Sequence, residues 1–291
     1  MTDDAGSSVP RRQLGRYLKE AREQAGIALE AAAVQCEWSR ARMYRIEGGR
    51  VSLRTHDVDL MCNIYGVGSE FREVLKSLAK ATKAHGWWHA YGTAVPSWFE
   101  LYVGLEAAAS RLRQYEPALI PGLLQRREYA ATILGSQPGM TEDAVGQAVA
   151  LRLERQRLLA RRHPKAPQLD VILHEVVLLG QWPGKREQLE HLIQAGRVPG
   201  VSIRVIPSVT RPAHWSLAGG FVILDFPPLG SRPPEPTTVY SESLTGALYL
   251  DRPAEVDTYS QAWTMLEDVA LNPPRSAALI AEIKEGSSEH E

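Results

Sequence analysis

Residues 26–49 read GIALEAAAVQCEWSRARMYRIEGG, and this stretch predicts two short helices joined by a tight turn. The Ala-rich run 28–35 favours a helix because alanine has the highest helix propensity. Ser39 is a good N-cap candidate for a second helix, which ends at Gly48. The turn between them, residues 36–38, has the length that a helix-turn-helix motif uses.

The second predicted helix carries three arginines, Arg40, Arg42 and Arg45. A helix fits the major groove of DNA, and an arginine can bond both acceptors on the edge of a guanine. From the helical period we expect Arg40 and Arg45 to project together while Met43 and Ile46 face the core. The pattern therefore predicts a DNA-reading helix.

Phosphate contacts are expected around the same helix. The Ser39 hydroxyl and the free backbone N–H groups of the first turn can bond phosphate oxygens, and Arg50 and Arg54 add positive charge. Such contacts position a protein on DNA without reading its sequence.

Apolar residues recur at helical spacing on both sides of the motif. We expect residues 1–10 to form a polar tail and the N-terminal part to be an all-α domain of five helices over residues 11–84. The flanking stripes are Leu14, Leu18, Ala21 and Ala25 before the motif, and Val58, Met61, Cys62, Tyr65, Phe71, Val74, Leu75 and Leu78 after it.

The stretch REQAGIALEAAAVQCEWSRARMYRIEGGR, residues 22–50, resembles the Xre-type, lambda-repressor-like DNA-binding domain. The resemblance implies a structural ion pair between Arg22 and Glu47. The base-contacting positions of the family fall on Arg40, Ala41, Arg42 and Arg45. Two residues depart from the family pattern: Leu29 stands where a backbone-contacting Gln is frequent, and Glu37 stands where the turn usually has Gly.

The charge of the chain is unevenly distributed. The 291 residues carry a net charge of −1, which by itself argues against a nucleic-acid partner. Residues 11–54, however, hold 10 basic and 5 acidic side chains, whereas residues 86–291 hold 19 basic and 23 acidic ones. The asymmetry predicts that the N-terminal domain binds DNA nonspecifically more readily than the C-terminal one.

Several classes of protein are not expected from this sequence. The two cysteines, Cys36 and Cys62, fall in apolar helical stripes and are expected to be buried thiols, with no metal-ligand spacing. We expect no cofactor, no signal peptide and no membrane segment, because the longest apolar runs are far shorter than the roughly 18 residues of a span. The protein is therefore expected to be cytoplasmic.

An aromatic-rich junction is expected at residues 85–98. Trp87, Trp88 and Trp98, together with Tyr115 beyond it, are candidates for a ligand pocket or a domain interface, and the pattern favours domain packing. A flexible linker would be polar instead.

Residues 99–285 are expected to form a mixed α/β domain with a small sheet. The strand–helix–strand order over residues 168–206 predicts a parallel βαβ unit. The predicted helices are 99–114, 125–134, 141–161, 185–196, 254–271 and 275–285, and the predicted strands are 168–173, 201–206, 220–226 and 237–240. The fold class is thus α+β and multidomain: five lambda-repressor-like helices followed by a regulatory α/β domain.

The C-terminal sequence contains no recognised catalytic motif, so we expect no enzyme. The alternative is an enzyme, for which His174, Glu175, Asp225 and Glu242 would have to meet in one pocket. A second alternative is a purely protein-interacting, antitoxin-like module, and either would carry an accessory DNA-binding domain.

The resemblance to known regulators continues through the C-terminal part. It resembles the domain of unknown function in actinobacterial, WhiJ-like and antitoxin-like regulators of Streptomyces and its relatives. The motifs are GWW (86–88), YEPALIPGLLQ (115–125), RLERQ (152–156), PGVSIRVIP (199–207), GGFVILDFP (219–227) and TGALYLDRPAEV (245–256). The resemblance implies transcription regulation and a small partner protein encoded by an adjacent gene.

Together these observations predict a sequence-specific transcriptional regulator that binds double-stranded DNA. Because one short helix reads few bases, we expect a homodimer on a palindromic operator, read by the helix at 39–47. The C-terminal domain would respond to the small partner protein or to a small-molecule effector.

Overall fold

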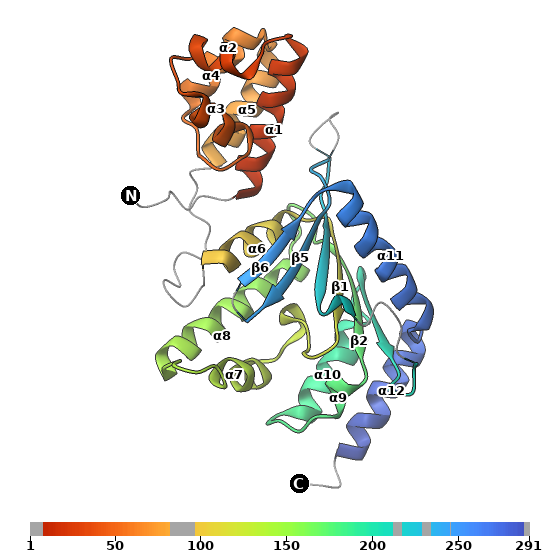
Figure 1. Cartoon of the computed structure of the whole chain (residues 1–291). Helices are drawn as coiled ribbons and strands as arrows, with labels where there is room; N and C mark the ends of the chain where they lie inside the picture. Colours follow the sequence, from red (N-terminus) through yellow and green to blue (C-terminus); the bar gives the residue numbers. More distant parts are fainter. Residues whose placement is uncertain (1–7, 82–96, 212–216, 229–233, 245, 288–291) are drawn as a thin grey trace. The chain divides into compact units, whose positions relative to one another are not determined.

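The computed structural model describes residues 8–81, 97–211, 217–228, 234–244 and 246–287. The chain forms two compact units, Met1–Ala90 and Tyr91–Glu291, and each is described by itself (Figure 1). The predicted fold class is confirmed: a helical unit precedes a mixed α/β unit. Of the predicted junction 85–98, residues 85–96 lie outside the described residues.

The first unit contains the five predicted helices. They are α1 (Ser8–Gln24), α2 (Leu29–Gln35), α3 (Arg40–Glu47), α4 (Thr55–Tyr65) and α5 (Ser69–Ala81). The prediction of a tail over residues 1–10 is wrong at its end, because α1 begins at Ser8. Pro10 is compatible with this start since the first turn of a helix needs no N–H donor there.

The helices pack around a continuous apolar core. Its fully buried side chains include Leu14, Tyr17, Leu18, Met43, Ile46, Met61 and Leu75. Helices α1 and α3 approach so closely that a Cβ on Gly15 would collide with the carbonyl oxygens of Ile46 and Glu47. Cys36 and Cys62 are buried free thiols, as predicted, and burial raises the pKa of Cys62 to about 11.

The second unit is built on a six-stranded mixed sheet in its described part, with strand order β3-β2-β1-β4-β5-β6. Strands β1, β2 and β3 are parallel, while β4, β5 and β6 join antiparallel. The strands are β1 (Arg111–Glu116), β2 (Gln168–His174), β3 (Val201–Ile206), β4 (Phe221–Asp225), β5 (Thr238–Ser243) and β6 (Gly246–Leu250).

Helices cover both faces of this sheet (Figure 1). On one face, α11 packs Trp263 and Leu266 against Tyr115, Phe221 and Ile223 of the sheet. The other face lies against α6, α8 and α10. The helices are α6 (Ser97–Ala108), α7 (Arg127–Gly135), α8 (Glu142–Gln156), α9 (Val176–Leu179), α10 (Lys185–Ala195), α11 (Pro253–Val269) and α12 (Pro273–Gly286).

The predicted helix over residues 99–114 is wrong in its second half. Helix α6 ends at Ala108, and Arg111 begins the strand β1 in the middle of the sheet. Charge pairs across the sheet make this strand stable: Arg111 Nε lies 2.8 Å from Asp170, and Arg113 Nη2 lies 3.2 Å from Asp225. These partners are distant in sequence, so the local pattern could not reveal them.

The predicted parallel βαβ unit is confirmed, with α10 connecting β2 and β3. Thr141 caps α8 by accepting a hydrogen bond from the N–H of Ala144 at 3.3 Å. The helix predicted to run to residue 161 ends earlier, at Gln156, and continues as a 3-10 turn over 157–160. Strand β6 and the short helix α9 were not predicted.

No helix among the described residues is both long and apolar enough to cross a membrane.

Candidate nucleic-acid interface

Helices α2 and α3 form the predicted helix-turn-helix. Ser39 caps α3: its hydroxyl accepts a hydrogen bond from the N–H of Arg42 at 3.2 Å. In the turn, the N–H of Trp38 donates to the carbonyl of Ala33 at 2.8 Å. Glu37 has a φ of 57°, the left-handed conformation that glycine adopts most easily. The turn therefore keeps its shape although Glu37 replaces the usual glycine.

A buried ion pair fixes α3 relative to α1. Arg22 Nε and Nη2 donate to the two carboxylate oxygens of Glu47 at 2.6 and 2.9 Å, and Nη1 donates to the carbonyl of Ile27 at 2.8 Å. The hydrogen bond from Glu47 is the main reason that the pKa of Arg22 is raised. A two-point pair of this kind sets orientation as well as distance. It is the ion pair implied by the resemblance.

The outward face of α3 is formed by Ala41, Tyr44 and Arg45, which are exposed, whereas Met43 and Ile46 are buried. Spacings of three and four residues place these exposed residues on one side of the helix. Tyr44 was not predicted as a contact, although its side chain is 60% exposed. Its three-residue distance from Ala41 was the signal that could have found it.

The three predicted base-reading arginines have different surroundings. Arg40 Nε donates to Glu30 on α2 at 2.5 Å, and both side chains are exposed. The guanidinium of Arg42 stacks over Trp38 at 4.2 Å and lies 3.7 Å from Asp57 on α4. Arg42 thus braces the turn against α4, which leaves Arg45 on the outward face.

Arg40 and Arg45 do not share one face, contrary to the prediction. Residues five apart on a helix of 3.6 residues per turn point about 140° apart. Arg40 lies on the flank toward α2, so it can reach DNA only from the edge of the helix. The two arginines can still contact different base pairs of one groove.

The predicted phosphate contacts surround this helix. Arg50 is exposed, and its guanidinium lies 5.9 Å from the ring centre of Tyr44. Arg54 is exposed and precedes α4, where its backbone N–H donates to Asp57 at 3.2 Å. Ser39 is exposed but its hydroxyl already caps α3.

The predicted aromatic site is not assembled by the described residues. Trp87 and Trp88 lie outside them, and Trp98 belongs to α6, although its side chain is not described. Tyr115 is 2% exposed in the core against α11, so it is not available to a ligand or a domain interface.

The residues of the enzyme alternative do not meet in one pocket. Asp225 pairs with Arg111 at the beginning of β1, whereas His174 ends β2 beside the last residue of β1. Glu175 is bonded to the backbone and hydroxyl of Ser208, both at 2.6 Å.

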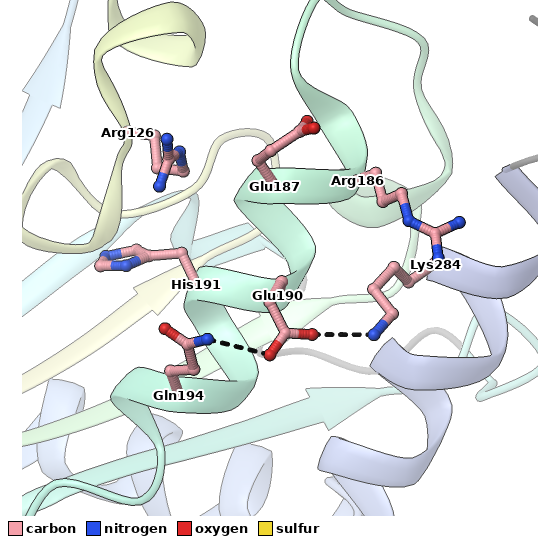
Figure 2. Close-up of a pocket in the computed structure, with 7 residues that line it drawn as sticks. All are labelled: Arg126, Arg186, Glu187, Glu190, His191, Gln194 and Lys284. Carbon is pink, nitrogen blue, oxygen red and sulfur yellow. Dashed lines mark hydrogen bonds and ion pairs between the residues drawn. The ribbon is translucent and has the colours of Figure 1, made fainter.

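An open depression of about 300 Å³ lies over the exposed face of α10 (Figure 2). It is lined by Arg126, Arg186, Glu187, Glu190, His191, Gln194 and Lys284. Glu190 accepts hydrogen bonds from Lys284 at 2.8 Å and Gln194 at 3.0 Å. Burial, and then the charge of Arg126, lower the pKa of His191. Opposite charges are mixed here, so the depression favours no one ligand chemistry.

The fold and the exposed face of α3 define the helix-turn-helix class, and this domain indicates a DNA-binding regulator. A family model described as a helix-turn-helix domain matches residues 13–75. Another, described as a domain of unknown function (DUF5753), matches residues 99–282, more than half of the chain. The chain therefore belongs to the DUF5753 family. No curated protein and no solved structure matches it.

Proposed function

We propose that this protein is a sequence-specific transcriptional regulator of the Xre type that reads its operator with the outward face of α3. The observation that carries the proposal is the exposed set Ala41, Tyr44 and Arg45 on a capped helix held by the Arg22–Glu47 pair. A rigid support matters because base readout needs side chains placed within hydrogen-bond distance.

Each element of this face has a chemistry that suits DNA. Arg45 can donate two hydrogen bonds to a guanine, while Ala41 can contact the methyl group of a thymine. Tyr44, with Arg50 against its ring, offers a hydroxyl beside a positive charge and suits the phosphate at the groove edge. The proposed contact set therefore adds Tyr44 to the residues that the sequence predicted.

We further propose that the protein acts as a homodimer in the cytoplasm. A single helix of eight residues reads only a few base pairs, so two copies on half-sites about 34 Å apart supply the necessary specificity. The proposal excludes catalysis, since His174 and Asp225 lie at opposite ends of the strands. The DUF5753 domain serves as the regulatory part, responding to a small protein or small molecule, as in WhiJ-like, antitoxin-like actinobacterial regulators.

Footprinting on the DNA upstream of the protein's own gene tests this function. The expected result is a protected palindrome whose halves are one helical turn, or a multiple of it, apart. Sedimentation should show two copies per operator. Arg45→Ala should abolish the footprint at concentrations that saturate the wild type, whereas Lys19→Ala, which removes the same charge from exposed α1, should retain it. Equal protection by both variants would contradict the proposal.

A further inference from the structure

Two carboxylates of the second unit flank a glycine on neighbouring strands. In the antiparallel registers Tyr115 pairs with Phe221 and Val222 pairs with Tyr240. Continuing both registers brings Glu116, Gly220 and Glu242 into one row across β1, β4 and β5. Strands lie about 4.8 Å apart, so the two acidic residues are separated by about 10 Å of backbone. Side chains of one row share a face of the sheet.

The middle position of this row has no side chain. A Cβ on Gly220 would lie 3.4 Å from Glu116 Oε2, which is ordinary van der Waals contact, and the residue has no left-handed backbone. An alanine would therefore fit the fold. Glycine instead leaves a notch between the two carboxylates. Glu116 is half-buried and Glu242 is exposed, so solvent reaches the notch.

A third charged group, Arg152 of α8, faces the same notch. Its charge lowers the pKa of Glu116, and the charge of Glu242 in turn raises the pKa of Arg152. Among the described residues, Arg152 nevertheless forms no ion pair within 4.0 Å; Nη1 donates to Gln125 at 2.7 Å. Most of its donors are therefore directed at a space that no described carboxylate fills. The adjacent Arg155, by contrast, is fully paired with Glu106.

Neighbouring side chains hold the two carboxylates in place. Gln114 Nε2 donates to Glu116 Oε1 at 2.8 Å, and the Tyr240 hydroxyl donates to Glu242 Oε2 at 2.7 Å. Each carboxylate keeps a second oxygen for another donor. Burial raises the pKa of Glu116 to about 7, and burial lowers that of Arg152 to about 10. Both groups therefore lack the full compensation that an ordinary ion pair gives.

We propose that this notch binds a small zwitterion, an α-amino acid, with its ammonium group over Gly220 between Glu116 and Glu242 and its carboxylate on Arg152. An amine without a carboxylate would leave the Arg152 guanidinium facing another cation. A carboxylate without an amine would face two like charges. The zwitterion satisfies all three groups with charge-assisted hydrogen bonds.

The test is isothermal titration of the full chain with the common L-α-amino acids, each compared with its amide and its N-acetyl derivative. At least one amino acid should bind. Its amide lacks the anionic group and its N-acetyl derivative lacks the cationic one, so both should bind at least tenfold more weakly. Binding of none of the amino acids, or equal binding of the two derivatives, would overturn the proposal.

Two mild variants locate the site. Gly220→Ala places a methyl group in the notch, and Glu242→Gln keeps an acceptor for Tyr240 while removing the charge. Each should weaken binding at least tenfold with an unchanged circular dichroism spectrum. Gly146→Ala, on α8 where a Cβ would meet nothing within 4 Å, is the matched control and should bind as the wild type does. Undiminished binding by Gly220→Ala would refute this location.

The regulatory meaning of the notch rests on the proposed function, since an amino acid bound there would be the small-molecule effector. The titration uses no DNA, however. Loss of footprinting with intact amino-acid binding would contradict the proposed function alone, and the reverse would contradict the ligand site alone. Linkage requires the ligand to bind the DNA-competent and incompetent states with different affinities.

Discussion

Replacing Glu37 with glycine is expected to stabilise the helix-turn-helix by about 0.5–1 kcal/mol. Glu37 has a φ of 57°, and a left-handed conformation costs an L-residue roughly 1–2 kcal/mol. Glycine avoids that cost but loses about 0.4–1 kcal/mol through the greater freedom of its unfolded chain. The side chain of Glu37 is exposed, so its removal disturbs no packing.

Hydrogen exchange in the full chain measures this gain locally. The N–H of Met43 is bonded to the carbonyl of Ser39 in the first turn of α3, directly after the strained residue. Its exchange should slow by about two- to fivefold in Glu37→Gly, provided that exchange follows unfolding of the unit. Glu37→Ala is the control, because it removes the carboxylate but keeps the Cβ, and it should not slow exchange. Equal slowing in both variants would refute the backbone argument.

Three further predictions concern stability. Burial raises the pKa of Glu116 to about 7 from 4.5, so the folded state holds its proton more tightly and loses stability as the pH rises between these values; Glu116→Gln should remove this slope in urea unfolding, a gain of at most about 3 kcal/mol at pH 8, less as solvent screens the group. Glu47→Gln leaves a buried arginine unpaired and should cost about 3–5 kcal/mol in the same measurement, and a loss below about 1 kcal/mol would contradict the assigned role. Gly49→Ala adds a collision with the backbone of Arg12, 2.7 Å from its Cα, to the strain of a φ of 66°, so it should lower the melting temperature much more than Gly26→Ala, which has the strain without the collision.

The first unit could be predicted largely from its sequence because its signals are local. The cap at Ser39, the glycine that ends α4 at Gly66 and the apolar stripes each act within a few residues. The Arg22–Glu47 pair joins residues 25 apart, and it was reached only through the resemblance. The orientation of Arg40 toward Glu30 depends on how α2 packs against α3, which the helical period of α3 does not contain.

The second unit was less predictable because its sheet joins distant segments. The alternating residues of β1 follow α6 after a two-residue break without glycine or proline, so they extended the helical pattern. The notch at Gly220 depends on the registers of three strands that are more than 100 residues apart from first to last. A sequence pattern shows the three residues but not that they form one row.

The most direct test of the central claim is the affinity of the full chain for its footprinted operator, measured by fluorescence anisotropy for the wild type, Arg40→Ala/Arg45→Ala and Lys19→Ala. Each good base contact contributes about 1–3 kcal/mol of discrimination. We expect the double variant to lose at least tenfold in affinity for the operator while its affinity for a scrambled duplex changes much less, and Lys19→Ala to keep the preference. Full operator binding by the double variant would show that α3 is not the recognition helix.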